Sequence, residues 1–260
     1  MQTKSKQINF LAVLLCITLA SAWAGETKKC DKSMKCEKML KGIIHFSDND
    51  VRFATKDQGV IFIDPVSGPE DSTVIKSGLF KPDLILITHP HGDHFQPDVL
   101  KAYIKTNPDV VLAGPAQVVE LAIKAGIDNM KTVEPNQKYG LAGVKVKTLP
   151  AYFSKGDSHP KENGWVGYVL MLNGLTYYIT GDTEPVPEMA DLKVDVLMPL
   201  LYGCGGNIDQ AIKMSKLTKA ALVVPVHTGG QKEVIKKFVS RLPDDVHSAC
   251  YLGAKLKVVK

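Results

Sequence analysis

Short apolar runs recur along the chain from residue 51 onward and predict β-strands. The runs are rich in valine and isoleucine, and most are bounded by glycine, proline or aspartate. This pattern is typical of strands that are buried in a layered fold. The predicted strands are residues 51–54, 60–63, 84–87, 110–113, 144–149, 166–172, 175–179, 194–198, 222–226 and 256–259.

Apolar residues at helical spacing separate several of these strands. The predicted helices are residues 97–105, 115–125, 208–219 and 232–242. Pro97 suits a first helical turn, and Gly126 suits the position just past a helix end. Strands interleaved with helices predict a layered α/β or α+β fold. No repeat or long linker divides residues 42–260, so we expect one domain there.

The N-terminus has the pattern of a secretory signal peptide, residues 1–24. Two lysines precede an apolar run, residues 10–20, and small residues at 22 and 24 suit a cleavage site. The run is short for a transmembrane helix. We therefore expect an exported protein, periplasmic or secreted, that is not attached to a membrane after cleavage; an uncleaved anchor is the alternative. The lysine-rich residues 25–41 are expected to form a loose lead-in.

Composition narrows the class of protein. The chain has 260 residues, of which 45% are hydrophobic and 23% charged, and these values exclude disorder and a multi-span membrane protein. The net charge of +5 is spread along the chain, so no nucleic-acid partner is expected. Export would permit disulfides, but the sequence does not determine whether the cysteines pair or stay as thiols: Cys30, Cys36, Cys204 and Cys250.

One cluster of side chains indicates metal chemistry. The segment Thr88-His89-Pro90-His91-Gly92-Asp93-His94 follows a predicted strand and holds three of the chain's seven histidines. Imidazoles and carboxylates are ligands for Zn²⁺ and similar metals. So many polar groups on one tight turn would be unfavourable without a cation. The segment therefore predicts a metal site.

Three more candidate ligands lie at or near predicted strand ends: His159, Asp182 and His227. Loops at strand ends often carry functional side chains on a rigid scaffold. Each residue alone has an ordinary explanation, since an aspartate in a turn is usually a cap and a loop histidine is usually solvated. Only the complete set favours a metal site.

The set, in this order and spacing, resembles the metallo-β-lactamase superfamily. The resemblance covers about residues 42–260 and implies a four-layered αβ/βα sandwich, with two mixed sheets flanked by helices. It implies two divalent metal ions, with zinc favoured and manganese or iron as alternatives. It also implies ligands: His89, His91 and His159 on the first ion, Asp93, His94 and His227 on the second, and Asp182 bridging the two.

Within the superfamily, the chain looks similar to the small metal-dependent hydrolases related to ascorbate-phosphate lactonases. The stretches that carry this similarity are residues 159–161, 164–168, 181–184 and 225–227. Two stretches depart from that branch. Ser47-Asp48-Asn49 replaces a Gly-His-Ala-like turn, and the glycine-rich stretch Tyr202-Gly203-Cys204-Gly205-Gly206-Asn207 contains a cysteine.

The resemblance implies a hydrolase that cleaves an ester, lactone or phosphodiester bond of a small molecule with a metal-bridged hydroxide. Asp93 is expected to be both ligand and catalytic residue, orienting the nucleophile, with Thr88, Thr183 and Asp64 positioning ligands. Tyr202, Asn207 and Trp165 are candidate substrate contacts, although aromatic residues could equally belong to the core.

Other functions remain open at this level. A non-catalytic metal-binding or partner-binding protein has the same ligands, and a nuclease is disfavoured by the small charge. A β-lactamase is disfavoured because those enzymes generally have cysteine or another residue where this chain has Asp182. The substrate and the oligomeric state are not predicted.

Overall fold

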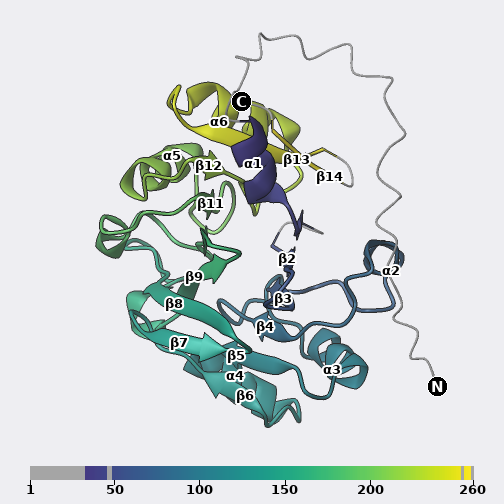
Figure 1. The fold of residues 1–260 in the computed structure, drawn as a ribbon. Coiled ribbons are helices and arrows are strands. Elements are labelled where there is room, and N and C mark those ends of the chain that lie inside the picture. Colours follow the sequence, from purple (N-terminus) through teal and green to yellow (C-terminus); the bar gives the residue numbers. More distant parts are fainter. Residues whose placement is uncertain (1–32, 46–48, 253–254, 259–260) are drawn as a thin grey trace, which may run out of the picture.

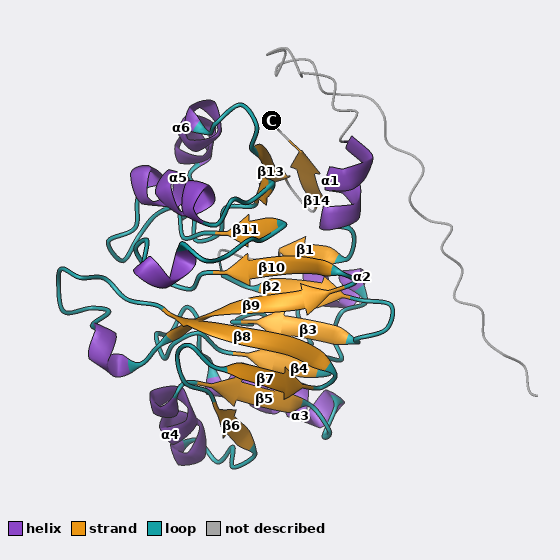
Figure 2. Ribbon diagram, turned by 60° about the vertical axis from the view of Figure 1, so that its left-hand side comes forward, coloured by secondary structure: helices purple, strands orange, loops and turns teal. Residues whose placement is uncertain are grey.

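A computed structural model describes residues 33–45, 49–252 and 255–258. Two β-sheets pack face to face, and helices cover their outer faces (Figure 2). The first sheet comes from the N-terminal half of the chain and the second from the C-terminal half (Figure 1). The four-layered fold expected from the resemblance is confirmed.

The first sheet has six strands in sequence order. They are β1 (Ile43–His45), β2 (Val51–Ala54), β3 (Val60–Ile63), β4 (Leu84–Leu86), β5 (Val111–Gly114) and β6 (Met130–Thr132). Strands β3 to β6 run parallel. The helices of this half are α2 (Ser72–Ser77), α3 (Pro97–Thr106) and α4 (Ala116–Lys124), and buried side chains of α3 and α4 pack in one cluster with Phe62 and Ile85 of the sheet.

The second sheet has eight strands in the order β14-β13-β12-β11-β10-β9-β8-β7. They are β7 (Lys138–Leu141), β8 (Val144–Pro150), β9 (Val166–Leu172), β10 (Leu175–Ile179), β11 (Val196–Met198), β12 (Leu222–Val223), β13 (His247–Leu252) and β14 (Lys255–Val258). The short 3₁₀ helices η1 (Lys161–Asn163) and η2 (Pro187–Met189) lie in its loops, and α5 (Ile208–Leu217) and α6 (Lys232–Arg241) cover its outer face.

Strand periodicity explains how both faces of the sheets become buried. In β9, Tyr168, Leu170 and Leu172 belong to the cluster between the sheets, whereas Val169 packs with the cluster under α5 and α6. Successive side chains of a strand point to opposite faces, so a strand between two covered faces is apolar throughout.

The topology brings several strand ends to one edge of the sandwich. Strands β10, β11 and β12 run parallel, so their carboxyl ends lie together. The end of β8 pairs with the start of β9, and the start of β9 also pairs with the end of β10. The loops after β8, β10 and β12 therefore meet at this edge, and each carries one of the three distant candidate ligands.

The structure corrects the expectation for the lead-in. Within residues 25–41, α1 (Ser33–Leu40) is a helix, and Cys36 and Met39 are buried. The predicted signal peptide and Cys30 lie outside the described residues. Among the residues that are described, no helix has both the length and the apolar character needed to cross a bilayer.

Candidate metal centre

The loop after β4 gathers three imidazoles. A tight turn, in which the His94 and Phe95 amides donate to the His91 carbonyl at 2.9 and 2.8 Å, folds this segment back on itself. The ring centroid of His89 lies 4.8 Å from that of His91 and 3.9 Å from that of His94. His89 and His94 are almost fully buried and His91 is half-buried, so the turn places two of the three imidazoles inside the protein.

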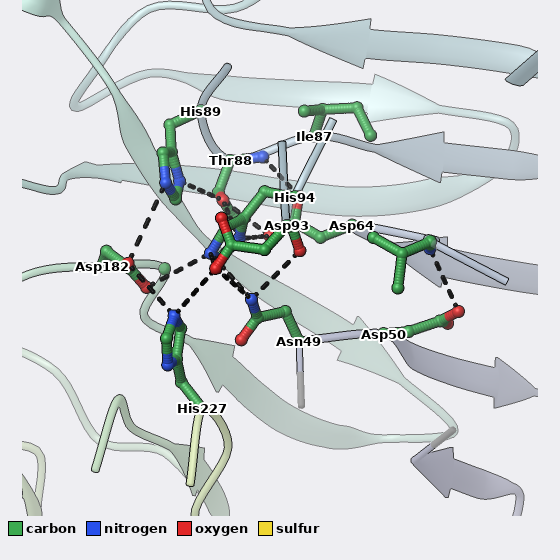
Figure 3. A network of polar contacts seen from close by, with 12 residues as sticks. Asn49, Asp50, Asp64, Ile87, Thr88, His89, Asp93, His94, Asp182 and His227 are labelled. Carbon is green, nitrogen blue, oxygen red and sulfur yellow. Dashed lines mark hydrogen bonds and ion pairs between the residues drawn. The ribbon is translucent and has the colours of Figure 1, made fainter. Parts of the chain in front are cut away.

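The distant candidates converge on this turn. The His159 ring, on the loop after β8, lies 4.8 Å from His89 and 4.7 Å from His91. His227, on the loop after β12, has its Nε2 3.2 Å from Asp93 Oδ2. Asp182, on the loop after β10, lies between His89 and His227 (Figure 3).

The Asp182 carboxylate faces four imidazoles. Its Oδ2 lies 4.0 Å from His89 Nε2, 3.8 Å from His159 Nε2 and 3.5 Å from His227 Nε2, and its Oδ1 lies 3.5 Å from His94 Nε2. The exposed fraction of its side chain is only 2%. A buried carboxylate that faces imidazoles of both predicted ligand groups is placed to bridge two metal ions.

The predicted ligands form two groups whose ligand atoms lie within 4.8 Å of one another. The first is His89, His91 and His159, and the second is Asp93, His94 and His227. A third group, His89, His94 and Asp182, links them. An ion held at about 2.0–2.2 Å by nitrogen and oxygen ligands spans ligand separations of up to about 4.4 Å, so these groups need only small adjustments to hold one.

Unpartnered buried atoms support a cation at this site. His89 Nε2, both ring nitrogens of His159 and Asp182 Oδ2 have no hydrogen-bond partner among the described residues. Buried polar atoms are normally hydrogen bonded. Imidazole nitrogens and a carboxylate oxygen that converge without protein partners fit a divalent metal ion.

Asp64 and Thr88 contact the Nδ1 atoms of the candidate ligands, on the side away from the centre. Asp64 Oδ2 lies 2.8 Å from His94 Nδ1, and Asp64 also accepts hydrogen bonds from the Thr88 amide at 2.7 Å and the Thr88 hydroxyl at 2.6 Å. These contacts turn the Nε2 of His94 toward the centre. The Thr183 hydroxyl instead accepts from the Tyr152 amide and donates to the Tyr152 carbonyl.

Charge and burial perturb the pKa values of these groups. Burial opposes protonation of His94, but the carboxylates of Asp64 and Asp182 outweigh it and raise its pKa to about 10. Burial lowers the pKa of His159 to about 4 and that of His89 well below its usual value. Burial would raise the pKa of the Asp182 carboxyl, but the imidazoles, His94 foremost, lower it.

The structure adds Asn49, a residue that sequence reasoning did not assign. Its Nδ2 lies 2.9 Å from His94 Nε2 and donates to the Asp93 carbonyl at 3.1 Å and to Asp93 Oδ2 at 3.3 Å. Asn49 belongs to the stretch 47–49, which differs from the related hydrolases, and this difference is the sequence feature that could have drawn attention to it.

The three candidate substrate contacts lie in different settings. Trp165 is buried, and its ring lies 4.8–5.2 Å from those of His89, His91 and His159, so it forms a wall of the centre. The Asn207 side chain accepts from the Gln210 amide and caps α5. Tyr202 is 47% exposed, and its amide donates to the His227 carbonyl. Of the three, only Tyr202 combines an exposed ring with contact to a candidate ligand's backbone.

A family model described as a beta-lactamase superfamily domain matches residues 44–227. The chain belongs to the metallo-β-lactamase superfamily. A UPF0173 metal-dependent hydrolase of Pyrococcus abyssi is 32% identical over 178 residues, which cover 64% of this chain and 76% of that relative. Another, of Thermococcus onnurineus, is 30% identical over 177 residues, which cover 64% of this chain and 76% of that relative.

Solved structures agree with this membership. A crystal structure of a metal-dependent hydrolase from Parabacteroides distasonis superposes with a TM-score of 0.66 at 26% identity, covering 80% of this chain and 91% of that chain. Igni18, a metallo hydrolase of Ignicoccus hospitalis, superposes with a TM-score of 0.66 at 20% identity, covering 83% of this chain and 97% of that chain, and supports the fold alone. The chain is thus a metal-dependent hydrolase of the metallo-β-lactamase fold with a small-molecule substrate.

Proposed function

We propose that the protein is an exported hydrolase that uses two divalent metal ions to cleave an ester, lactone or phosphodiester bond of a small molecule. One observation carries this proposal: the buried Asp182 carboxylate lies within 4.0 Å of imidazoles from both ligand groups. A single ion would not need a second ligand group on the far side of that carboxylate.

The ligand assignment follows from the two groups. His89, His91 and His159 would hold the first ion, Asp93, His94 and His227 the second, and Asp182 both. Zinc is the favoured metal, since imidazole-rich sites suit it, while iron and manganese remain candidates. Bound as a pair, such ions supply a solvent nucleophile with a lowered pKa and Lewis-acid stabilisation of the charge that develops in the transition state.

The chain's own groups then orient the reaction. The Asp93 side chain is 55% exposed, and its Oδ2 lies 3.2 Å from His227 Nε2, so it has access both to the centre and to solvent. The Asp93 carboxylate would orient the nucleophile, accept its proton and pass that proton to the leaving group. Trp165 and the buried imidazoles exclude water from the inner side, and the exposed ring of Tyr202 is left to contact the substrate.

Metal analysis and a substrate panel test the hydrolase. The purified full chain should contain two equivalents of metal and hydrolyse at least one of a set of chromogenic esters, lactones and bis-phosphodiesters. His89→Ala and Asp182→Ala should lose both metal and activity, whereas Lys101→Ala, on the exposed face of α3, should lose neither. Full activity in either ligand variant would refute the assignment. Two bound metals without hydrolysis of any panel compound would instead favour a metal-binding protein.

Export is tested separately. The pattern of residues 1–24 supports cleavage before Gly25. Mass spectrometry of the protein isolated from its native host should find a chain that begins at Gly25 outside the cytoplasm. An intact Met1 on cytoplasmic protein would contradict export and leave the hydrolase proposal unchanged.

A further inference from the structure

The glycine-rich stretch after β11, residues 202–207, lies directly against the metal centre. A Cβ atom built on Gly203 would lie 3.0 Å from Cε1 of His227, and one built on Gly205 would lie 3.3 Å from the ring of Phe153. The Phe153 ring in turn lies 5.6 Å from that of His159. Both glycines have positive φ, 88° and 95°, so any side chain at either position would force the stretch away from the ligands.

Cys204 stands between these glycines and also has a positive φ, 48°. An L-residue with a side chain in the left-handed region costs on the order of 1 kcal/mol. Glycine would avoid that cost, and its neighbours are glycines. Strained residues of this kind concentrate at functional sites, so the thiol of Cys204 is a candidate for a role at the centre.

The ligand atoms of Cys204, His159 and Asp182 lie within 4.8 Å of one another. His159 and Asp182 are 0% and 2% exposed. Both ring nitrogens of His159 and Oδ2 of Asp182 have no hydrogen-bond partner in the described part of the chain. Two buried and unpartnered ligand atoms thus share one space with the sulfur. An ion at about 2.0–2.1 Å from nitrogen and about 2.3 Å from sulfur fits between such atoms with small adjustments.

We propose that Cys204 is an additional ligand of the first metal ion, beside His159 and Asp182. The inference rests on the proposed metal centre and goes beyond the histidine and aspartate ligand set that the family resemblance implies. When the ion binds, the S–H bond breaks, its proton leaves to solvent, and the sulfur lone pair forms the bond to the metal. Thiolate is a soft ligand, so Cys204 would favour Zn²⁺ or Co²⁺ over Mn²⁺ at this position.

Cobalt titration tests the sulfur–metal bond without measuring activity. The reduced, metal-free full chain is titrated with Co²⁺, and sulfur-to-cobalt charge-transfer absorption is recorded in the near ultraviolet. We expect this band in the wild-type protein and its loss in Cys204→Ser, while the visible cobalt bands of the remaining ligands persist. Cys36→Ala, which removes a thiol on α1, should keep the charge-transfer band.

A second measurement uses the unaltered protein. Iodoacetamide alkylation of Cys204, followed by mass spectrometry of the peptide that contains it, should slow when Zn²⁺ is added. Three results overturn the inference: a charge-transfer band that survives in Cys204→Ser, no such band in wild type, or alkylation at the same rate with and without Zn²⁺. Cobalt uptake by the remaining ligands would leave the proposed function standing in these cases. Failure of the wild-type protein to take up cobalt or zinc would overturn both proposals.

Discussion

Asp64 Oδ2 lies 2.8 Å from Nδ1 of His94, and both side chains are 3% exposed. The contact joins the loop after β3 to the histidine turn after β4, and Asp64 holds a positive φ of 48° to make it. With Nδ1 bound to the carboxylate, Nε2 points toward Asp93 and Asp182. The orientation of a candidate ligand is therefore set by a residue 30 positions earlier in the chain.

Replacing Asp64 by asparagine should weaken metal binding. The variant keeps the size of the side chain but removes the charge that orients His94 and increases its basicity, and such losses typically cost about 10–100-fold in metal affinity. Competition with a chromogenic chelator measures the change. Asp98→Asn, which alters a carboxylate that is 99% exposed on α3, is the control and should leave affinity unchanged. Equal affinities for the two variants would contradict the role of Asp64.

Asn49→Ala should lower hydrolysis of whichever panel substrate is cleaved while metal content stays at the wild-type value. The amide donates to the Asp93 carbonyl and carboxylate, and a hydrogen bond to a charged group contributes about 1.5–3 kcal/mol, or roughly 10–100-fold in kcat/KM. Gln58→Ala is the matched control, because Gln58 bonds to the Met171 carbonyl and the Asn173 amide, at the turn between β9 and β10. Loss of metal in Asn49→Ala would instead make Asn49 part of the binding site.

The sequence predicted the parts of the fold that have regular apolar patterns. Strands such as β3 and β9 were predicted with their bounds because their residues are nearly all buried. Strands β6 and β7 were missed because they alternate poorly and expose Lys131 and Lys138. The predicted strand 222–226 is longer than β12, since Val224 and Val226 are buried beyond the end of the paired residues.

For the metal centre, the sequence predicted the candidate ligands but not the residues that support them through distant contacts. Ligands such as His89 and Asp182 belong to residue types and positions that already suggest a metal, and the structure brings them together. Asn49 is not a usual type of metal ligand, and the departure of residues 47–49 from the related hydrolases marks its position without showing its role, which depends on contacts with residues 44 and 45 positions away. The buried pair of Asp50 and Arg52 was missed for a related reason: charged residues at a strand start are usually solvated.

Arg52→Ala should destabilise the fold strongly. Arg52 and Asp50 are both fully buried, with Nη2 2.7 Å from Oδ2 and Nε 2.8 Å from Oδ1, and the guanidinium also donates to the Leu79 and Ser67 carbonyls. Removing one partner leaves a buried charge, at a cost of about 3–5 kcal/mol. Arg241→Ala breaks an exposed pair with Asp209 and should cost about 1 kcal/mol or less. Denaturant unfolding measures both, and similar losses for the two variants would contradict this difference.

The metal-free protein should be most stable near pH 6.5, the ordinary pKa of histidine. The folded-state pKa of His94 is raised to about 10, so its contribution is fully present below pH 6.5 and is lost as the pH rises toward 10. The pKa of His159 is lowered to about 4, so the unfolded chain binds a proton first and stability falls as the pH drops from 6.5 through 4. Each proton changes the free energy of unfolding by up to about 1.4 kcal/mol per pH unit.

Unfolding curves of the metal-free and the metal-loaded protein across this pH range check the argument. The bound ion must displace the proton of His94, so loading at neutral pH should release protons, and the alkaline loss of stability should disappear in the loaded protein. Asp64→Asn should weaken the alkaline slope of the metal-free protein, because the carboxylate that raises the pKa of His94 is gone. An alkaline slope that is unchanged in this variant would show that another group titrates there.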